Sequence, residues 1–268
     1  MRIVVDLQGY QADNRFRGIG RYSVSLAKAI VRNGGEHEVL VALNGLFPDS
    51  IELIRAEFDG LLPQENIRVW EAVGPVSHYD GTNDWRRNTA ELVREAFVAS
   101  LKPDIVLVCS LFEGLHDDAV TSIGRLSRIV PTAVILYDLI PLIYRDLYLK
   151  DAAVEAWYEN KLHHLRRADF LLTISESSRK DAMRYLSFPE TASRTISTAI
   201  DDQFQPRAID SGRAADIRRR HKLHRPFLLY TGGIDHRKNI EGLIRAYAML
   251  PEKLRARHQL AIVCSIQP

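Results

Sequence analysis

The chain has 268 residues, of which 46% are hydrophobic and 26% are charged, and its formal net charge is +2. These values are typical of a globular protein with one large or two ordinary domains, and the near-neutral charge does not favour a nucleic-acid partner. No apolar run approaches the roughly 18 residues of a membrane span, and the start reads as a strand rather than a signal peptide. Cys109 and Cys264 lie in apolar runs, so we expect reduced core cysteines in a cytoplasmic protein.

Alternating strand and helix patterns fill the first 200 residues. Apolar runs typical of buried parallel strands occur at 3–7, 39–43, 67–70, 105–109, 133–137 and 170–174. Helical stripes lie between several of them: Leu26, Ala27, Ile30 and Val31; Leu92, Val93, Ala96 and Phe97; Val154, Tyr158, Leu162 and Leu165. This order predicts an α/β fold, a Rossmann-like parallel sheet with helices on both faces.

The pattern changes after residue 200. We expect an N-terminal domain over 1–205, a basic linker over 206–226 and the start of a second α/β domain over 227–268. The last segment holds one strand–helix–strand unit, with strands near 227–231 and 259–264 and a helix near 239–250. One such unit cannot bury its own apolar faces, so we expect an incomplete second domain that favours self-association.

Two glycines precede the first predicted helix. Arg17-Gly18-Ile19-Gly20-Arg21 follows the first strand, which ends at Asp6-Leu7-Gln8. Glycines before a helix allow close approach of an anionic group, although a turn that simply requires glycine is the alternative. The motif lacks the remaining residues of a dinucleotide fingerprint, and a nicotinamide dehydrogenase is disfavoured.

Polar residues also follow the fifth and sixth strands. Tyr137-Asp138 ends one strand, and Ser175-Glu176 ends the next. Parallel strands place such residues at the sheet edge where open α/β sheets bind ligands. A turn-forming Asp138 and an N-capping Ser175 are the structural alternatives.

A second glycine motif opens the second domain. The strand at 227–230 leads to Gly232 and Gly233, and Arg237 and Lys238 stand just before a helix. Glycine backbone, a helix N-terminus and two adjacent cations are together suited to a diphosphate. No Asp-x-Asp pair or histidine cluster indicates a metal site, and we expect most histidines, including the adjacent pair at 163–164, to lie on the surface. The basic run at 213–225 is either a solvated helix face or a contact with anionic lipid headgroups.

These motifs, in this order and spacing, resemble those of the retaining GT-B glycosyltransferases of family 4, most closely the bacterial mannosyl- and rhamnosyltransferase-like enzymes of surface polysaccharide and lipopolysaccharide assembly. The resemblance spans the N-terminal portion of such an enzyme. It implies hexosyl transfer from a nucleotide sugar, with a GDP-sugar as the first candidate, to a growing glycan or lipid-linked acceptor. No metal and no other cofactor is implied, and the work would take place in the cytoplasm or at the inner membrane surface.

The resemblance also implies roles for individual residues. Gly18, Gly20, Gly232, Arg237 and Lys238 would bind the donor diphosphate. Asp138 and Tyr137 would lie at the reaction centre, and Arg17, Arg21, Ser175 and Glu176 would line the cleft and acceptor side.

Two departures from the family pattern stand out. Tyr137 occupies a position where the family often has histidine, and the family's donor-holding Glu-x7-Glu motif belongs further along the second domain than residue 268. We therefore expect the chain to be inactive or nearly so by itself. Two alternatives remain: a non-catalytic half that binds a glycan or a partner and completes a site with another subunit, and an α/β nucleotide-binding regulator.

Overall fold

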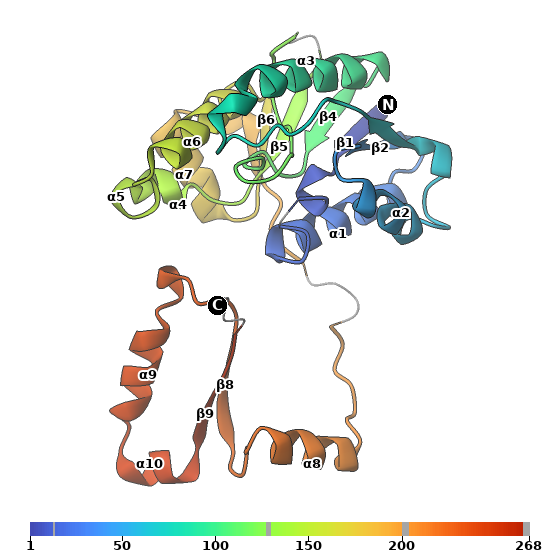
Figure 1. Ribbon diagram of the computed structural model, residues 1–268. Coiled ribbons are helices and arrows are strands. Elements are labelled where there is room, and N and C mark those ends of the chain that lie inside the picture. The colour runs from blue at the N-terminus through green and yellow to red at the C-terminus, as the bar shows by residue number, and fades with distance from the viewer. Residues whose placement is uncertain (13, 127–129, 200–203, 265–268) are drawn as a thin grey trace. The chain divides into compact units, whose positions relative to one another are not determined.

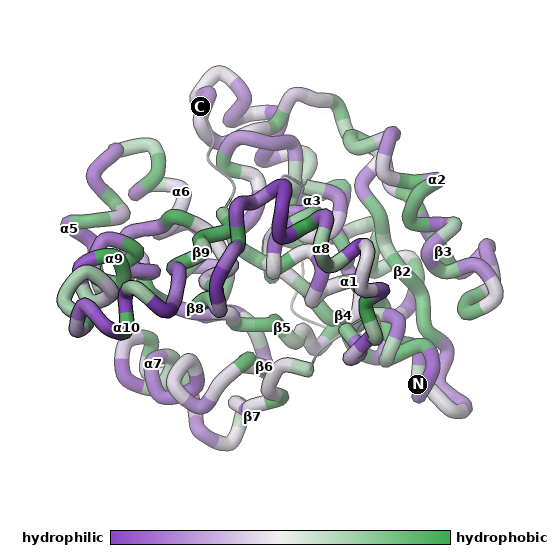
Figure 2. Tube along the Cα trace, turned by 90° about the horizontal axis from the view of Figure 1, so that it is seen from below, coloured by the Kyte–Doolittle hydropathy of each residue, from purple (hydrophilic) through white to green (hydrophobic). Residues whose placement is uncertain are grey.

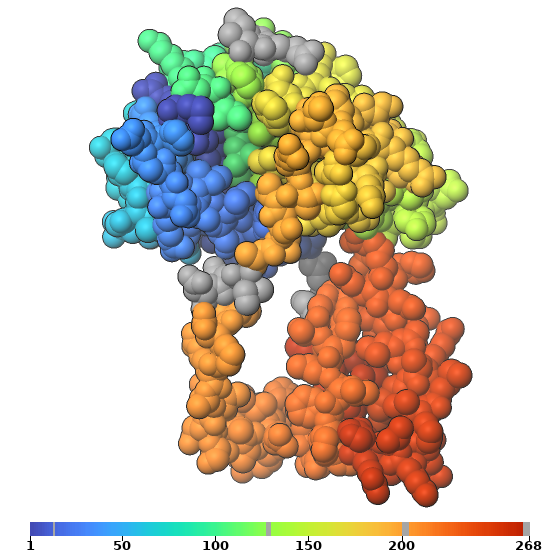
Figure 3. Space-filling model, turned by 180° about the vertical axis from the view of Figure 1, so that it is seen from behind, coloured from blue at the N-terminus to red at the C-terminus, as the bar shows by residue number. Residues whose placement is uncertain are grey.

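The computed structural model describes residues 1–12, 14–126, 130–199 and 204–264 (Figure 1). The chain forms two compact units, Met1–Asp201 and Asp202–Pro268. In the space-filling view the larger unit is one closed body, in which the first segments (blue) pack directly against much later ones (yellow) (Figure 3).

A seven-stranded parallel sheet forms the centre of the larger unit. Its order is β3-β2-β1-β4-β5-β6-β7, so β2 and β3 are added on one side of β1 and the later strands on the other, and the strand order reverses between β1 and β4. The strands are β1 (Arg2–Asp6), β2 (Glu38–Asn44), β3 (Ile67–Trp70), β4 (Ile105–Val108), β5 (Thr132–Leu136), β6 (Phe170–Thr173) and β7 (Ser193–Thr195). Ligands of such sheets bind at the carboxyl ends of the strands near this reversal.

Helices cover both faces of the sheet. They are α1 (Gly18–Arg32), α2 (Pro48–Glu57), α3 (Asp84–Ser100), α4 (Ile140–Ile143), α5 (Arg145–Tyr148), α6 (Ala152–Leu165) and α7 (Glu176–Leu186). Helices α1 and α2 pack on one face, whereas α3, α6 and α7 pack on the other. The expected α/β class, with helices on both faces of a parallel sheet, is confirmed.

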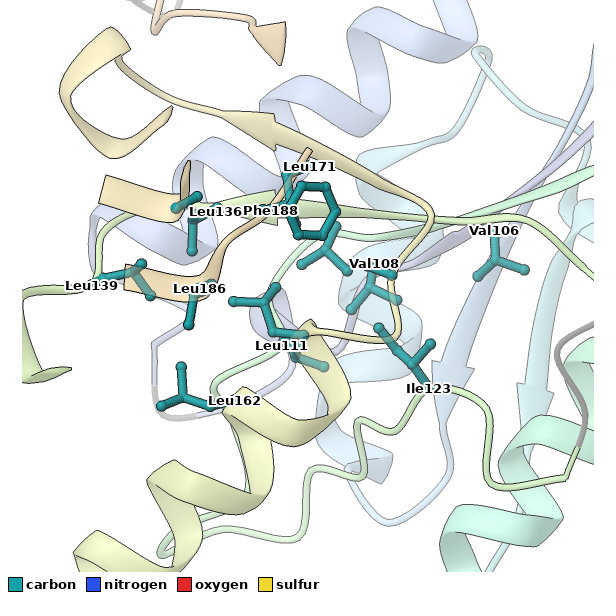
Figure 4. Packing of buried hydrophobic residues seen from close by; sticks show 14 of the residues in the cluster. Val106, Val108, Leu111, Ile123, Leu136, Leu139, Leu162, Leu171, Leu186 and Phe188 are labelled. Carbon is teal, nitrogen blue, oxygen red and sulfur yellow. The ribbon is translucent and has the colours of Figure 1, made fainter. Parts of the chain in front are cut away.

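Alternation along each strand divides the core into two layers. In β1, Val4 belongs to the layer under α3 and α6, and the next residue, Val5, belongs to the layer under α1 and α2. Because both faces are covered, strands such as β2 and β5 are apolar almost throughout (Figure 2). Figure 4 shows Leu186 of α7 and Leu162 of α6 pointing toward one another, with Leu111 beside them.

A buried ion pair fixes α3 to the first strand. Arg94 of α3 contacts the carboxylate of Asp6 at the end of β1, with a distance of 2.7 Å from Nε to Oδ2, and both side chains are 3% exposed. Asp6 also accepts hydrogen bonds from the backbone and side-chain amides of Gln8. Removing the charges of both groups from water is costly, so the pair depends on these additional hydrogen bonds.

The predicted buried stripe of α3 is wrong except at Phe97, which packs against the core. Leu92, Val93 and Ala96 are exposed, whereas Glu91 and Arg94 face the interior. The polar side chains are buried because each has an ionic partner there, Arg125 for Glu91 and Asp6 for Arg94. Apolar periodicity cannot identify a helix face that is buried through paired charges.

A long buried loop connects β4 to β5. Residues 110–124 contain no helix or strand, yet most of them are buried. Side chains from other elements bind its backbone: Gln8 at Val120, Arg94 at Ser122, Lys161 at Thr121 and His164 at Ile123. These contacts provide the hydrogen bonds that a buried backbone requires.

His164 is one of these anchors, and its expected surface position is wrong. It is 1% exposed, and its Nδ1 lies 3.1 Å from the amide nitrogen of Ile123. Burial lowers its pKa to about 3, so the ring is neutral at physiological pH.

The smaller unit contains one strand–helix–strand unit and a preceding helix. Its elements are α8 (Ser211–Arg220), β8 (Phe227–Thr231), α9 (Ile240–Ala248), α10 (Glu252–Arg257) and β9 (Gln259–Val263), with β8 parallel to β9. The helix expected near 239–250 is present as α9, and the additional short helix α10 follows it, with Pro251 as its N-cap. Leu228, Leu229 and Val263 remain exposed.

The six strands expected in the larger unit are all present, each within one residue of the expected range at either end. The short β7 was not anticipated, because its three residues carry no apolar run. Cys109 is buried as expected, but Cys264 lies after β9 and is only half-buried; both are free thiols.

We predict that Arg94→Met lowers the free energy of unfolding by about 3–5 kcal/mol, because Asp6 would keep a buried charge without its partner. Urea unfolding followed by circular dichroism measures this loss. Arg145→Met is the control, since Arg145 pairs with Glu155 and Glu159 at the surface and should cost less than about 1 kcal/mol. Adding Asp6→Asn to Arg94→Met should recover part of the loss; a cost of Arg94→Met equal to that of the control would contradict the assignment.

Candidate functional site

The glycine motif forms the start of α1. Arg17 is the N-cap, Gly18 is the first helical residue, and both are exposed together with Arg21. Added side-chain carbon at Gly18 would meet nothing within 4 Å, so this position is open. Gly20 is buried, and a Cβ there would lie 2.5 Å from the carbonyl oxygens of Asn14 and Arg15. Glycine is therefore required at 20 by close backbone approach, whereas at 18 it leaves the helix start accessible.

Tyr137 connects this helix start to the sheet. Its hydroxyl lies 3.1 Å from Ser23 Oγ, 3.2 Å from the carbonyl oxygen of Cys109 and 3.3 Å from that of Ile19. Its ring also packs edge-on against Tyr22. Burial raises the pKa of the phenol, so Tyr137 stays protonated near neutral pH. The geometry suits a side chain that holds α1 in place more than one that transfers protons.

Asp138 lies on the wall of a pocket in the larger unit. One carboxylate oxygen accepts a hydrogen bond from the amide of Ile140 at 3.0 Å, as in a turn that starts α4. The pocket has a volume of about 220 Å³. Its walls come from α1, the loop after β4, the end of β5 and the region from α4 to α6: Ile19, Ser110, Leu111, Phe112, Ile135, Tyr137, Asp138, Pro141, Tyr148, Leu149, Val154, Trp157 and Tyr158.

Aromatic rings dominate one side of this pocket. Phe112 lies 5.0 Å from Tyr158 and 6.3 Å from Trp157, centroid to centroid. The hydroxyl of Tyr158 is buried on this side of the pocket, close to the backbone of Leu142. A mostly apolar pocket with one carboxylate and a few hydroxyl groups is typical of a small-molecule site.

Ser175 and Glu176 occupy the start of α7. Ser175 caps the helix by accepting the amide of Ser178, and Ser178 Oγ donates to the carbonyl oxygen of Tyr137 at 2.6 Å. The capping role considered for Ser175 is therefore confirmed. The hydrogen bond from Ser178 to Tyr137 connects α7 to the end of β5. Glu176 instead pairs with Arg179 and accepts from Thr195 at the surface, and these contacts lower its pKa to about 2. Neither Ser175 nor Glu176 is among the residues that line the pocket.

The second glycine motif lies between β8 and α9. Gly232 has a φ of +156°, a conformation that residues with side chains rarely adopt. Arg237 and Lys238 form a short 3-10 turn, and Arg237 Nε donates to Asp235 at 2.8 Å. Asn239 then caps α9 by accepting the amide of Gly242. Both cations thus stand before a helix start, as the sequence suggested.

The sequence missed most of the pocket. Tyr158 was expected only as part of an apolar helical stripe, and Phe112 and Trp157 belong to no motif that the sequence analysis singled out. The available signal was the long segment without a helical or strand pattern after the fourth strand, which lies at the ligand-binding edge of the predicted sheet.

The described residues contain neither a cluster suited to a metal ion nor a helix suited to span a membrane. No group of three or more His, Cys, Asp or Glu side chains in that part of the chain is placed to hold a metal ion. Among the described helices, none combines the length and apolar character needed to cross a membrane.

Comparison with known proteins supports the family resemblance. No protein-family model matches the chain. Over its whole length it is 34% identical to a serotype-specific mannosyltransferase WbdA from Escherichia coli, of which it spans 32%. A second WbdA from E. coli is 32% identical over 91% of the chain, and O-antigen chain mannosyltransferase B is 29% identical over 52%. The chain thus spans about a third of the length of the curated relatives it matches.

Solved structures agree in fold. The chain superposes on HepE from Anabaena, crystallised with UDP and glucose, with a TM-score of 0.56, covering 98% of this chain and 60% of that one at 12% identity. The glycosyltransferase WaaG, which takes part in lipopolysaccharide biosynthesis, gives a TM-score of 0.50 at 14% identity, covering 98% and 63%. The chain is a homologue of one part of the WbdA mannosyltransferases, and its fold is that of the GT-B glycosyltransferases.

Proposed function

We propose that the chain is the acceptor-side portion, with the start of the donor side, of a retaining, metal-independent hexosyltransferase. It would transfer mannose or a related hexose from a nucleotide sugar to a growing surface polysaccharide or lipid-linked glycan, in the cytoplasm or at the inner membrane surface. The observation that carries the proposal is the 34% identity to a mannosyltransferase over the whole chain. The pocket beside Asp138 and the cationic turn at Arg237 and Lys238 are consistent with it.

The pocket is suited to one hexose of the acceptor. Sugar rings present C–H faces that pack on aromatic rings, and Phe112, Trp157 and Tyr158 offer such rings. The carboxylate of Asp138 can accept hydrogen bonds from sugar hydroxyl groups, and the hydroxyl of Tyr158 can donate one. We therefore place the terminal sugar of the acceptor in this pocket.

The donor diphosphate would bind at the second glycine motif. The guanidinium of Arg237 and the ammonium of Lys238 would offset its charge, including the charge that develops on the leaving group. In family members of this type the leaving phosphate accepts the proton of the acceptor hydroxyl, which accords with a protonated Tyr137. The Gly18–Gly20 segment would contribute a helix start to phosphate binding. GDP is our first candidate for the nucleotide, on the ground that the relatives are mannosyltransferases.

We predict that replacing both Arg237 and Lys238 by alanine weakens GDP binding by about a hundredfold, because two charge-assisted contacts to phosphate are lost. Isothermal titration of the purified chain measures the affinity. The control replaces Arg218 and Arg219, exposed cations on α8, and should change it less than threefold. Equal affinity of both double variants would favour the non-catalytic, glycan-binding alternative, whereas ATP binding as tight as GDP binding would favour a general nucleotide-binding regulator.

We predict that Trp157→Ala weakens binding of α-mannobiose by about tenfold, because the sugar loses an aromatic wall of the pocket. Chemical-shift perturbation or calorimetry measures this without reliance on tryptophan emission. Trp85→Ala is the matched control, since Trp85 is exposed on α3 and does not line the pocket. Trp157→Phe should retain most of the affinity; if Trp157→Ala binds mannobiose as well as the parent chain, the pocket is not the acceptor site.

A further inference from the structure

Glu113 is a buried carboxylate that the proposed reaction does not use. It lies in the loop after β4 and is 3% exposed. One oxygen accepts from Ser110 Oγ at 2.6 Å and from Asn14 Nδ2 at 3.1 Å, and the other accepts from Asn14 Nδ2 at 2.9 Å. Its side chain therefore joins two segments almost 100 residues apart.

Asn14 in turn determines where α1 begins. Its carbonyl oxygen accepts the amide of Arg17 at 2.9 Å and the amide of Gly20 at 3.3 Å. The absence of a side chain at Gly20 is what permits this approach. The position of Asn14 thus sets the position of the first turn of α1, including Gly18 and Ile19.

The backbone of Glu113 also holds Trp157, a residue of α6 that lines the pocket. Its carbonyl oxygen accepts the indole N–H of Trp157 at 3.2 Å. Ile19, Ser110 and Trp157 all line the pocket, and each is linked to Glu113 directly or through Asn14. One residue outside the pocket thereby connects α1, the loop after β4 and α6.

We propose that Glu113 is the positioning residue of this site: it holds residues 14–20, hereafter the entry segment, against the loop after β4, and so presents the start of α1 to the substrate. The chemistry is that of a buried acceptor satisfied by an amide and a hydroxyl, which is costly to disrupt because the carboxylate would be left without donors. Glu113 itself touches no substrate in this arrangement. Its functional meaning rests on the function proposed above, but its structural role does not.

The charge of Glu113 makes the attachment of the entry segment to the loop after β4 depend on pH. Burial raises its pKa to about 7; nearby Asp117 also raises it, while Ser110, Asn14 and Lys161 of α6 act in the opposite direction. If the entry segment opens, the carboxyl meets water and returns to its ordinary pKa near 4.5. The closed form then binds a proton more tightly than the open form. Closure is therefore strongest below about pH 4.5, weakens as the pH rises to about 7, and is constant above that.

Amide hydrogen exchange of the whole chain tests the proposal. After correction for intrinsic rates, exchange at residues 17–22 should accelerate between pH 5 and 7 and level off above it, relative to core amides of β4. In Glu113→Gln this local acceleration should disappear. Glu91→Gln, at another buried glutamate that bonds Arg125 and not the entry segment, should keep the parent profile. A parent profile that is flat, or one that Glu113→Gln leaves unchanged, would overturn the proposal.

A paired substitution distinguishes loss of the contact between Asn14 and Glu113 from a general loss of stability. Asn14→Asp would set two carboxylates against each other and should speed exchange of residues 17–22 by at least about tenfold at pH 7.5. Combining it with Glu113→Gln restores a donor and an acceptor and should return exchange to within about threefold of the parent. Exchange in the combined variant as fast as in Asn14→Asp would contradict a direct contact. Because no ligand is added, this outcome does not depend on whether the chain binds mannobiose or GDP.

Discussion

The arrangement of the larger unit depends on one constraint: a long irregular loop is buried at the ligand-binding edge of the sheet. Buried amides and carbonyls that lack helix or strand partners must find others. In residues 110–124 many of those partners are side chains, including Gln8, Arg94, Lys161 and His164. This explains why α3 and α6 turn polar and charged residues inward, which an amphipathic helix normally avoids. The same loop supplies Ser110 and Phe112 to the pocket, so the requirements of stability and of binding meet in one segment.

The fold could be predicted from the sequence because it depends on patterns that are local. Six apolar runs predicted six strands, and their alternation with helices predicted a parallel sheet that is covered on both faces. The inward face of α3 could not be found in this way, since Arg94 is buried only because Asp6, 88 residues away, lies opposite it. The burial of His164 could not be predicted either, because it depends on the contact of this side chain with Ile123, which is 41 residues away. β7 was missed because Ser193, Arg194 and Thr195 owe their strand geometry to pairing with β6.

The site was predicted in part. The structure puts Ile19, between the two glycines, on the same pocket as Tyr137 and Asp138. It also shows what the glycines do differently, since Gly20 is required by backbone contact and Gly18 leaves the helix start open. The aromatic wall could not be recognised, because Phe112 and Trp157 are indistinguishable from core residues until the loop after β4 and helix α6 are placed together. For Arg237 and Lys238, a role in binding the donor is a proposal.

The side chains that bind the buried loop also affect the order in which the sheet folds. Gln8 bonds Val120 across 112 residues, and His164 bonds Ile123 across 41. On the ribosome the chain emerges from its first residue, so β1 can have its neighbouring strand β2 long before the groups that complete its carboxyl end exist. The loop can reach its final form only once α6 has emerged. Contacts this distant in sequence form slowly, so the carboxyl end of β1 and the loop after β4 should become ordered well after β1 has paired with β2.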